Sequence, residues 1–469
     1  MNVQQLIKTS DINKELCRRS LSEFIQQSFP IIDPSVEYLH NWHIDCIAEY
    51  LEACKRREIK RLIINIPPRS LKSISVSVCW TAWLLGLNPS EKILTASYSQ
   101  QLSTKHSLDT RYLINSDWYK SVFPELQLAK DENQKTRFET AQRGHRLAVS
   151  VAGGTIGEGG DILIVDDPHN PAQAVSEVQR KTALNWFDQS FSTRLNSKKN
   201  GVIVVVMQRL HDNDLTGHLK EKGQYEHLCL PAICKKKTII QVGSYKKIRK
   251  EGELLHSGRE GESELNEMKK TLGSSMFAGQ YQQEPAPDEG NIFNFNWFKR
   301  YINNPINGRV IQSWDTAIKA DQLNDFSVCT TWMISDSKYY LIDVFAQKLE
   351  YPELKKQVIY QSKLHNPDTI LIEDKASGQS LIQDLRLQTT LPVVAILPKH
   401  DKITRASTVT ALIESGSVTI PERAEWLMEF EQEIKMFPNG KHDDIVDSMT
   451  QFLNWIRLQS TKKPQVRLL

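Results

Sequence analysis

Long apolar runs, paired cysteines and an excess of charge of one sign are all missing from this sequence of 469 residues. The longest apolar run, Val202–Met207, is far shorter than the roughly 20 residues that span a bilayer, and the N-terminus lacks the apolar core of a signal peptide. The seven cysteines form no Cys-x-x-Cys pair, which argues against a zinc knuckle and a disulfide framework. We therefore expect a soluble, cytoplasmic protein that contacts no membrane.

The charge balance limits how the chain can bind nucleic acid. The net charge is only +3, so binding to DNA depends on local basic patches and not on a global field. The stretch 235–250 holds seven Lys or Arg and no acid, with a hairpin turn expected at 242–244. It either contacts duplex phosphates or forms a solvated hairpin, and the sequence favours neither.

The length exceeds the roughly 100–200 residues typical of one domain, so several compact units are expected. Residues 1–58 are predicted to be helical. From 59 to 231, short apolar runs alternate with helical or polar stretches, which is typical of a mostly parallel sheet covered by helices; the runs are 62–66, 93–96, 147–151, 162–165 and 202–207. The segment 232–290 contains the basic stretch and ends in a linker rich in proline and acids, and 291–469 is predicted to form a second α/β unit.

The first apolar run leads into a loop with the layout of a phosphate-binding loop. It runs from Pro67 to Lys72 and Ser73 and is followed by a helix-compatible segment. In that layout the lysine neutralises phosphate oxygens and the hydroxyl ligates Mg²⁺. Both glycines of the usual motif are missing, with Ile66 and Leu71 in their places, so an ordinary strand-to-helix turn is the alternative.

A pair of acids follows the apolar run at 162–165. Asp166 and Asp167 stand where a buried strand would deliver two carboxylates, the first for the Mg²⁺ shell and the second for the attacking water. A simple Asp-Asp-Pro turn is the alternative. The run at 202–207 ends in Gln208 and Arg209, where a sensor of the γ-phosphate would lie, unless this is a solvated loop.

A second group of acids lies in the C-terminal half. Asp315 and Glu373 each follow a predicted strand, and Asp443, Asp444 and Asp447 lie at the start of a predicted helix at 445–456. Clustered carboxylates suit Mg²⁺ or Mn²⁺, and two such ions support phosphodiester cleavage. Asp444 and Asp447 are three residues apart and share a helix face, whereas Asp443 either ligates metal or caps the helix.

The order of these motifs resembles the large terminase subunit of tailed phages and prophages. The resemblance covers residues from about 40 to 455 and rests on the succession of motifs in one chain. They are Pro67-Pro68-Arg69, Lys72-Ser73, Asp166-Asp167-Pro168, Gln208-Arg209-Leu210-His211, Gln280-Tyr281-Gln282-Gln283-Glu284-Pro285, Ser313-Trp314-Asp315, Ile372-Glu373-Asp374 and His442-Asp443-Asp444.

The resemblance implies an α/β protein with an additional-strand (ASCE) P-loop ATPase domain followed by an RNase H-like nuclease domain. After a helical segment at 1–58, it divides the chain into an ATPase core at 59–231, a basic lid or linker subdomain at 232–290 and a nuclease domain at 291–469. The implied activity is ATP-driven translocation of DNA into a procapsid, with cutting of concatemeric DNA by a nuclease that uses two Mg²⁺ or Mn²⁺ ions.

The resemblance also assigns roles to residues of the first half. Lys72 and Ser73 bind ATP phosphate and Mg²⁺, Asp166 supports that ion, and Asp167 takes the place usually held by a catalytic Glu, one methylene longer. Arg69 touches the γ-phosphate, while Gln208 and Arg209 form the coupling segment that reports hydrolysis. Arg143 or Arg146 is the candidate for an arginine finger supplied to a neighbouring subunit, and Trp42-His43 either stacks near adenine or packs on a helix.

In the second half, Asp315, Glu373 and Asp444 match the nuclease triad, with Asp443 and Asp447 as neighbouring metal ligands. The implied partners are double-stranded DNA without sequence preference, the portal protein and the small terminase subunit, in a homo-oligomeric ring transiently docked on the procapsid. Two alternatives remain open at this stage: a helicase-like ATPase with an inactive nuclease domain, and a non-catalytic packaging assembly protein.

Overall fold

The computed structural model describes residues 9–151, 153, 157–171, 173–285, 292–303, 307–316, 326–375, 377–398, 400–440 and 442–460. The chain divides into two compact units, residues 1–269 with 275–288 and residues 270–274 with 289–469. Most of the predicted linker, residues 286–290, lies outside the described residues. In the described part of the chain, no helix has the length and hydropathy needed to cross a membrane.

The first unit begins with three helices, α1 (Thr9–Arg19), α2 (Leu21–Ile32) and α3 (Trp42–Lys55). They occupy most of the described part of the segment that the sequence predicts to be helical. Ser20 begins α2, since its hydroxyl accepts a hydrogen bond from the Glu23 N–H at 3.3 Å.

An eight-stranded, mostly parallel sheet forms the centre of the first unit. Its strand order is β3-β4-β5-β2-β6-β7-β1-β8. All five predicted strands are present: β1 (Arg61–Asn65), β2 (Lys92–Ser97), β5 (His145–Ser150), β6 (Ile162–Asp166) and β7 (Val202–Met207). Because β7 lies between β1 and β6, one additional strand separates the phosphate-loop strand from the strand that carries the paired acids. This is the expected ASCE arrangement.

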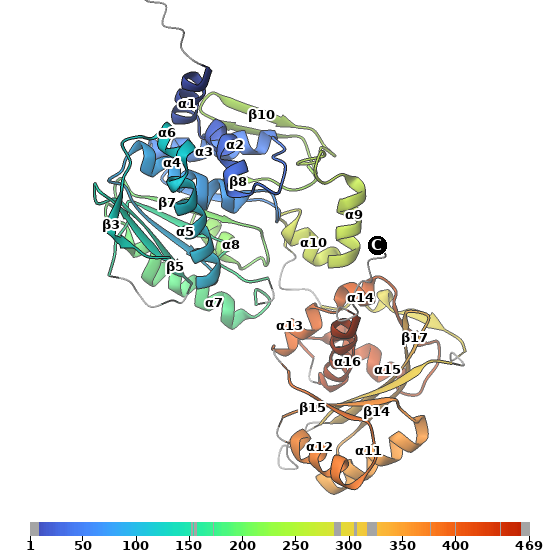
Figure 1. The fold of residues 1–469 in the computed structure, drawn as a ribbon. Coiled ribbons are helices and arrows are strands. Elements are labelled where there is room, and N and C mark those ends of the chain that lie inside the picture. Colours follow the sequence, from blue (N-terminus) through green and yellow to red (C-terminus); the bar gives the residue numbers. More distant parts are fainter. Residues whose placement is uncertain are drawn as a thin grey trace, which may run out of the picture. The chain divides into compact units, whose positions relative to one another are not determined.

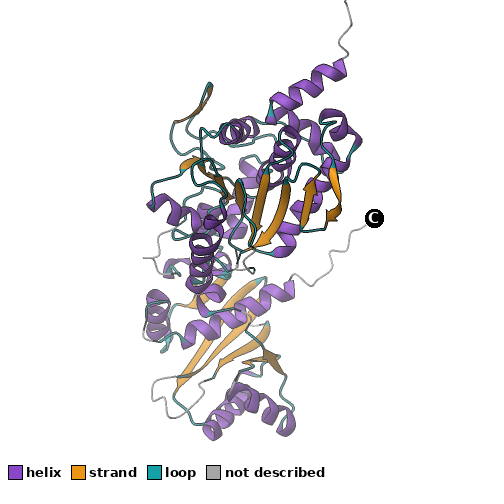
Figure 2. Ribbon diagram, turned by 90° about the vertical axis from the view of Figure 1, so that its left-hand side faces the viewer, coloured by secondary structure: helices purple, strands orange, loops and turns teal. Residues whose placement is uncertain are grey.

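Helices cover both faces of this sheet (Figures 1 and 2). Alternate residues of each strand point to opposite faces; Leu62 and Ile64 join one buried apolar cluster and Ile63 joins the other. The first cluster includes α2, α3 and α5 and the second includes α8. The covering elements are η1 (Ile74–Cys79, a π-helix), α4 (Trp80–Leu87), α5 (Gln100–Asn115), α6 (Asp117–Val122), α7 (Glu177–Trp186), η2 (Phe187–Phe191, a π-helix), η3 (Ser192–Arg194) and α8 (Leu215–Glu221).

Three strands of this sheet were not predicted from the sequence. They are β3 (Leu128–Asn133), β4 (Arg137–Thr140) and β8 (Glu226–Cys229). They lie at the two ends of the strand order, and none of them has a continuous apolar run in its sequence.

The basic stretch forms the expected hairpin, with β9 (Thr238–Val242) paired antiparallel to β10 (Tyr245–Arg249). Gly243 in the turn has φ 53°, a left-handed conformation that glycine adopts without strain. Two further helices follow, α9 (Glu262–Leu272) and α10 (Ser274–Gln280).

The second unit is built on a seven-stranded sheet in the order β11-β17-β14-β13-β12-β15-β16. The strands are β11 (Lys299–Tyr301), β12 (Arg309–Asp315), β13 (Ser327–Ser335), β14 (Lys338–Gln347), β15 (Thr369–Glu373), β16 (Val393–Ile396) and β17 (Val418–Pro421), after the short helix η4 (Phe295–Trp297). One face packs on α15 (Leu427–Met436) and α16 (Asp444–Ser460), and the other on α11 (Tyr351–His365) and α12 (Ser377–Gln388). Two short helices, α13 (Lys402–Ser407) and α14 (Thr410–Glu414), precede β17.

Candidate functional site

The loop after β1 adopts a glycine-like path although it contains no glycine. Arg69 has φ 62° and Leu71 has φ 58°, conformations that cost about 1–3 kcal/mol each for residues with a Cβ atom. The Leu71 side chain packs against the buried cluster beneath the loop, which offsets part of that strain. The missing glycine therefore does not prevent the loop from adopting the left-handed turn.

The two residues after Leu71 meet the paired acids from β6. Lys72 Nζ lies 3.0 Å from Asp167 Oδ2, and Ser73 donates a hydrogen bond of 3.0 Å to Asp166 Oδ1. Ser77, in the π-helix η1, donates to the other oxygen of Asp166 at 2.7 Å. The structure thus brings together the lysine, the hydroxyl and both carboxylates that the sequence singled out.

Burial makes both carboxylates less acidic than usual. It raises the pKa of Asp166 and of Asp167, while the nearby Lys72 ammonium acts in the opposite direction on both. Asp167 itself has φ 46°, a left-handed conformation that Asp tolerates better than most residues. With this backbone the Asp167 carboxylate reaches Lys72 although its side chain is one methylene shorter than that of Glu.

These groups border a cavity of about 600 Å³ in the first unit. Arg69, Lys72 and Ser73 line it together with Asp167 and Gln208. The Oε1 atom of Gln208 is buried and has no hydrogen-bond partner among the described residues. The cavity volume and the lysine fit a nucleoside triphosphate with its Mg²⁺.

Two buried residues near Asp166 have roles that the sequence did not indicate: His106 was not singled out, and Arg146 was expected only as a candidate arginine finger. His106, on α5, lies with Nδ1 3.5 Å from Asp166 Oδ2, and burial lowers its pKa to about 4. Arg146, on β5, is fully buried, donates to the Ser77 carbonyl at 3.3 Å, and has its pKa lowered by burial to about 9. Because Arg146 is enclosed, it does not fit the role of an arginine finger. The other candidate, Arg143, has a side chain that is 86% exposed.

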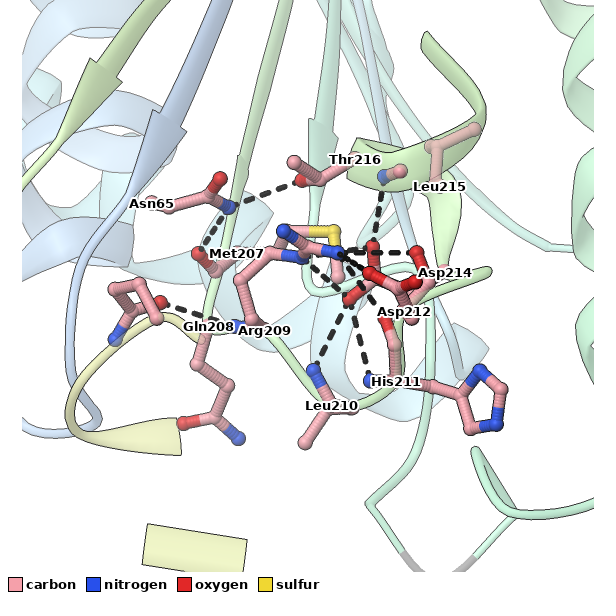
Figure 3. Close-up of polar contacts among 12 residues, drawn as sticks. Asn65, Met207, Gln208, Arg209, Leu210, His211, Asp212, Asp214, Leu215 and Thr216 are labelled. Atoms are coloured by element: carbon pink, nitrogen blue, oxygen red, sulfur yellow. Dashed lines mark hydrogen bonds and ion pairs between the residues drawn. The ribbon is translucent and has the colours of Figure 1, made fainter. Parts of the chain in front are cut away.

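Gln208 and Arg209 follow β7, and their side chains point in different directions. The Gln208 N–H donates to Asp167 Oδ1 at 3.4 Å, and its side chain lines the cavity. The Arg209 side chain instead meets Asp214, with Nε 3.0 Å from both carboxylate oxygens (Figure 3). Arg209 therefore holds the turn after β7 in place.

Asp214 is the centre of that turn. Its fully buried carboxylate accepts hydrogen bonds from the backbone N–H groups of Leu210 at 3.0 Å and Gly217 at 3.0 Å, and it also begins α8 (Figure 3). A Cβ atom on Gly217 would lie 1.9 Å from the Asp212 carbonyl oxygen, so only glycine fits there.

The predicted acids of the second unit gather at the ends of neighbouring elements. Asp315 ends β12, Glu373 ends the adjacent parallel strand β15, and Asp444 begins α16. Burial and the nearby charges of Asp447, Glu373 and Asp444 raise the pKa of Asp315 well above its ordinary value. We call Asp315, Glu373, Asp443, Asp444 and Asp447 the acidic cluster.

Cations from α13 are already paired with the acidic cluster. Arg405 bonds Glu373 Oε2 at 3.1 Å and Asp447 Oδ1 at 2.8 Å, and Lys402 lies 2.7 Å from both Asp443 Oδ1 and Asp447 Oδ2. Among the described residues, no three His, Cys, Asp or Glu side chains are arranged to hold a metal ion. The all-carboxylate donor set still fits Mg²⁺ or Mn²⁺, since a divalent cation would relieve the repulsion that raises the pKa of Asp315.

A buried polar network fixes α16 against β12. Ser313 donates to the Ser448 carbonyl at 2.8 Å, and Ser448 donates to the Ser313 carbonyl at 2.7 Å. Gln451 adds a bond of 2.9 Å to Ser313 Oγ. At the start of α16, Glu433 of α15 accepts the Val446 N–H at 2.9 Å. These bonds set the position of Asp444 and Asp447 relative to Asp315.

Two family models match the chain. The one described as "Terminase large subunit, T4likevirus-type, N-terminal" matches residues 63–300, more than half of the chain. The one described as "Terminase RNaseH-like domain" matches residues 312–455. The chain belongs to the terminase large-subunit family. Its two units accordingly carry the terminase ATPase fold and an RNase H-like fold.

Solved terminase structures share this fold at low sequence identity. The large terminase of a thermophilic bacteriophage, in complex with ADP, is 11% identical, with 89% of this chain and 100% of that chain covered and a TM-score of 0.55. The same phage protein in complex with ATP-gamma-S is 10% identical, with 92% and 98% covered and a TM-score of 0.53. A search of curated proteins found no match.

In this terminase chain, Trp42 and the basic hairpin pack against each other. Lys247 Nζ lies 5.0 Å from the centroid of the Trp42 ring, and Arg249 Cζ lies 5.4 Å from it. Trp42 is therefore packed and not free to stack on adenine, whereas His43 lines the cavity, and burial lowers its pKa to about 3. One face of the hairpin is buried through Ile240, so the hairpin is not fully solvated.

The terminase chain has a link between the cavity and the end of its first unit. The Arg209 N–H donates to Gln283 Oε1 at 3.0 Å, and Gln283 Nε2 donates to the Gln280 carbonyl at 2.6 Å. Gln283 is 4% exposed and lies just before the predicted linker. From the sequence alone, Gln283 is only one member of the motif Gln280-Tyr281-Gln282-Gln283-Glu284-Pro285 and has no predicted role.

We expect Gln283→Ala to loosen the turn after β7. The substitution leaves the buried Arg209 N–H without an acceptor, which costs about 1–3 kcal/mol. Hydrogen exchange at the Arg209 amide should therefore rise by about 5- to 150-fold, measured by mass spectrometry of the full chain. Gln224→Ala, at an exposed position, is the matched control, and equal exchange in both variants would contradict the role given to Gln283.

Proposed function

We propose that the chain is an ATP-hydrolysing DNA-packaging motor that also cuts DNA with a metal-dependent nuclease. The observation that carries the proposal is that Lys72, Ser73 and Asp167 line one cavity, where Asp166 accepts a hydrogen bond from Ser73. The acidic cluster of the second unit supports the nuclease half. The phage relatives in complex with ADP and with ATP-gamma-S support a nucleotide as the ligand of the cavity.

In the ATPase unit, each residue has a task that follows from its position. Lys72 gives up its contact with Asp167 and neutralises phosphate charge, with Arg69 at the cavity mouth. Ser73 and Asp166 hold the Mg²⁺ that accompanies ATP, and this ion lowers the cost of charge on the phosphates. Asp167, released from Lys72, accepts a proton from the attacking water or orients it.

Gln208 reports the state of the cavity to the rest of the unit. Its side chain lines the cavity, while its backbone N–H donates a hydrogen bond to Asp167. If Gln208 moves when ATP is hydrolysed, the adjacent Arg209 moves with it. The hydrogen bond from the Arg209 N–H to Gln283 Oε1 then transmits the movement to Gln283. This path leads from the ATPase centre to the segment before the nuclease unit.

In the nuclease unit, Asp315, Glu373 and Asp444 are the proposed ligands of two divalent ions, with Asp443 beside them. When bound, such ions activate water and stabilise the leaving oxygen. Asp447 is 3% exposed and bonded to both Arg405 and Lys402, so we assign it to holding Arg405 and, before metal binds, Lys402. Arg405 in turn orients Glu373.

Exposed lysine side chains on the basic hairpin are the proposed contacts with DNA. Lys246 lies on the outer face of the basic hairpin, whereas Arg249 is buried beneath it. We propose that this outer face contacts duplex phosphates without reading bases. The portal protein and the small terminase subunit are the proposed partners, with several copies of the chain forming a ring on the procapsid in the host cytoplasm.

The test is protection of DNA by procapsids that carry the cognate portal. With ATP and Mg²⁺, the chain should make linear DNA resistant to added DNase, and a non-hydrolysable ATP analogue should abolish this protection. Hydrolysis of ATP without any DNA protection would reject the packaging role while leaving the ATPase intact.

A further inference from the structure

A lysine from α13 lies between two carboxylates of the acidic cluster. Lys402 Nζ is 2.7 Å from Asp443 Oδ1 and 2.7 Å from Asp447 Oδ2. The Lys402 ammonium therefore occupies a carboxylate oxygen of Asp443 that a metal ion would need.

The position of Lys402 is stabilised by its two carboxylate partners, whereas its location at the start of a helix is unfavourable for a cation. Lys402 is the first residue of α13, and Asp401 caps this helix by accepting the Thr404 N–H at 2.8 Å. A cation in the first turn of a helix faces the positive end of the helix dipole, which is unfavourable. The two ion pairs must therefore outweigh that local cost.

Lys402 and Arg405 differ in how easily each can separate from its carboxylate partners in the acidic cluster. Arg405 and its partner Asp447 have side chains that are 12% and 3% exposed, and separating a buried pair is strongly unfavourable. Lys402 and Asp443 are 49% and 35% exposed, so water can replace their contact with little loss. Asp447, the buried second partner of Lys402, keeps its ion pair with Arg405 when Lys402 leaves. Arg405 is thus a fixed part of the site, and Lys402 is the removable part.

We infer that Lys402 is a built-in competitor of the divalent cation, which holds Asp443 and Asp447 together until metal binds and thereby lowers the metal affinity of the acidic cluster. The inference rests on the proposed nuclease function and deepens it. The ammonium blocks carboxylate oxygens and repels an incoming divalent ion. Cleavage is then suppressed at low free metal concentration.

The test is isothermal titration of the nucleotide-free full chain with MnCl₂. Lys402→Met keeps the length of the side chain and removes its charge, and should bind Mn²⁺ about tenfold more tightly, as expected for a half-exposed charge a few ångströms away. Lys402→Arg should retain the weaker binding. Lys356→Met removes a charge from an exposed pair on α11 and should match the wild type.

Thermal unfolding in EDTA gives a second readout. Without metal, Lys402→Met leaves Asp443 unpaired and Asp447 with one cation fewer, so its melting temperature should fall below that of the wild type. Mn²⁺ should then raise the melting temperature of Lys402→Met by more than it raises that of the wild type, because the variant binds the ion more tightly.

Asp315→Asn separates the inference from the proposed function on which it rests. If this variant leaves Mn²⁺ affinity unchanged, the ion binds elsewhere and the proposed nuclease function fails. If Asp315→Asn weakens binding but Lys402→Met gives equal or weaker affinity than the wild type, Lys402 does not compete with metal, and the inference alone is overturned.

Discussion

Replacing Lys72 with alanine is expected to lower the rate of ATP hydrolysis by about 100- to 1,000-fold. Lys72 is the buried cation on the cavity that contacts Asp167 at 3.0 Å. Without it, phosphate charge in the cavity has no ammonium to neutralise it, and Asp167 loses its ion pair. Phosphate release measured over time with saturating ATP checks the effect.

Two further variants make the result on Lys72 specific. Lys72→Met fills the space without a charge and should be as inactive as Lys72→Ala, which excludes a simple packing defect. Lys181→Met removes an exposed lysine on α7 that pairs with Glu177 and should keep full activity. DNA cleavage with Mn²⁺ should survive in all three variants, because the acidic cluster lies in the other unit. ATP hydrolysis near the wild-type rate in Lys72→Ala would remove the cavity from the mechanism.

The sequence predicts those strands whose burial on both faces of a sheet requires an unbroken run of apolar residues. Central parallel strands are buried on both faces and appear as continuous apolar runs, which is why β1, β6 and β7 were located correctly. Strand β13 was missed because its buried residues include Ser327, Thr330 and Thr331, which interrupt its apolar residues. The edge strand β3 was missed because its sequence, with Lys130, Asp131, Glu132 and Asn133, contains no apolar run.

The candidate site likewise contains residues that the sequence predicts and residues that it does not. Residues at strand ends, such as Asp166 and Asp315, are predictable because motif spacing places them at the carboxyl edge of a sheet. Their supports are not predictable, since His106 reaches Asp166 and Arg405 reaches Glu373 only through tertiary packing. For Leu71, the sequence shows only that a residue with a Cβ atom replaces the usual glycine, whereas its positive φ and its packing against the buried cluster are features of the structure.

Replacing Asp315 with asparagine is expected to reduce metal-dependent DNA cleavage by about 100- to 1,000-fold, which corresponds to the several kcal/mol that a well-placed metal ion supplies. Asn keeps the size of the side chain but loses the charge that a divalent cation needs. Nicking of supercoiled plasmid with Mn²⁺ measures the effect, and ATP hydrolysis should remain at the wild-type rate. Asp343→Asn, at a carboxylate of β14 that bonds His365 at 3.0 Å, is the matched control and should cut normally.

The same Asp315→Asn variant should be more stable than the wild type when metal is absent. The folded pKa of Asp315 lies well above its unfolded value, so this carboxyl group opposes folding at every pH above the unfolded pKa. The penalty grows as the pH rises from the unfolded pKa to the folded pKa and is constant above it, so it is larger at pH 8 than at pH 5.5. In EDTA at pH 8, Asp315→Asn should therefore raise the melting temperature by about 2–4 °C for each kcal/mol relieved, with a smaller gain at pH 5.5. Lower stability of the variant at pH 8 would mean that the acidic cluster is not under like-charge repulsion. The case for a divalent ion drawn to Asp315 would then lose its physical basis.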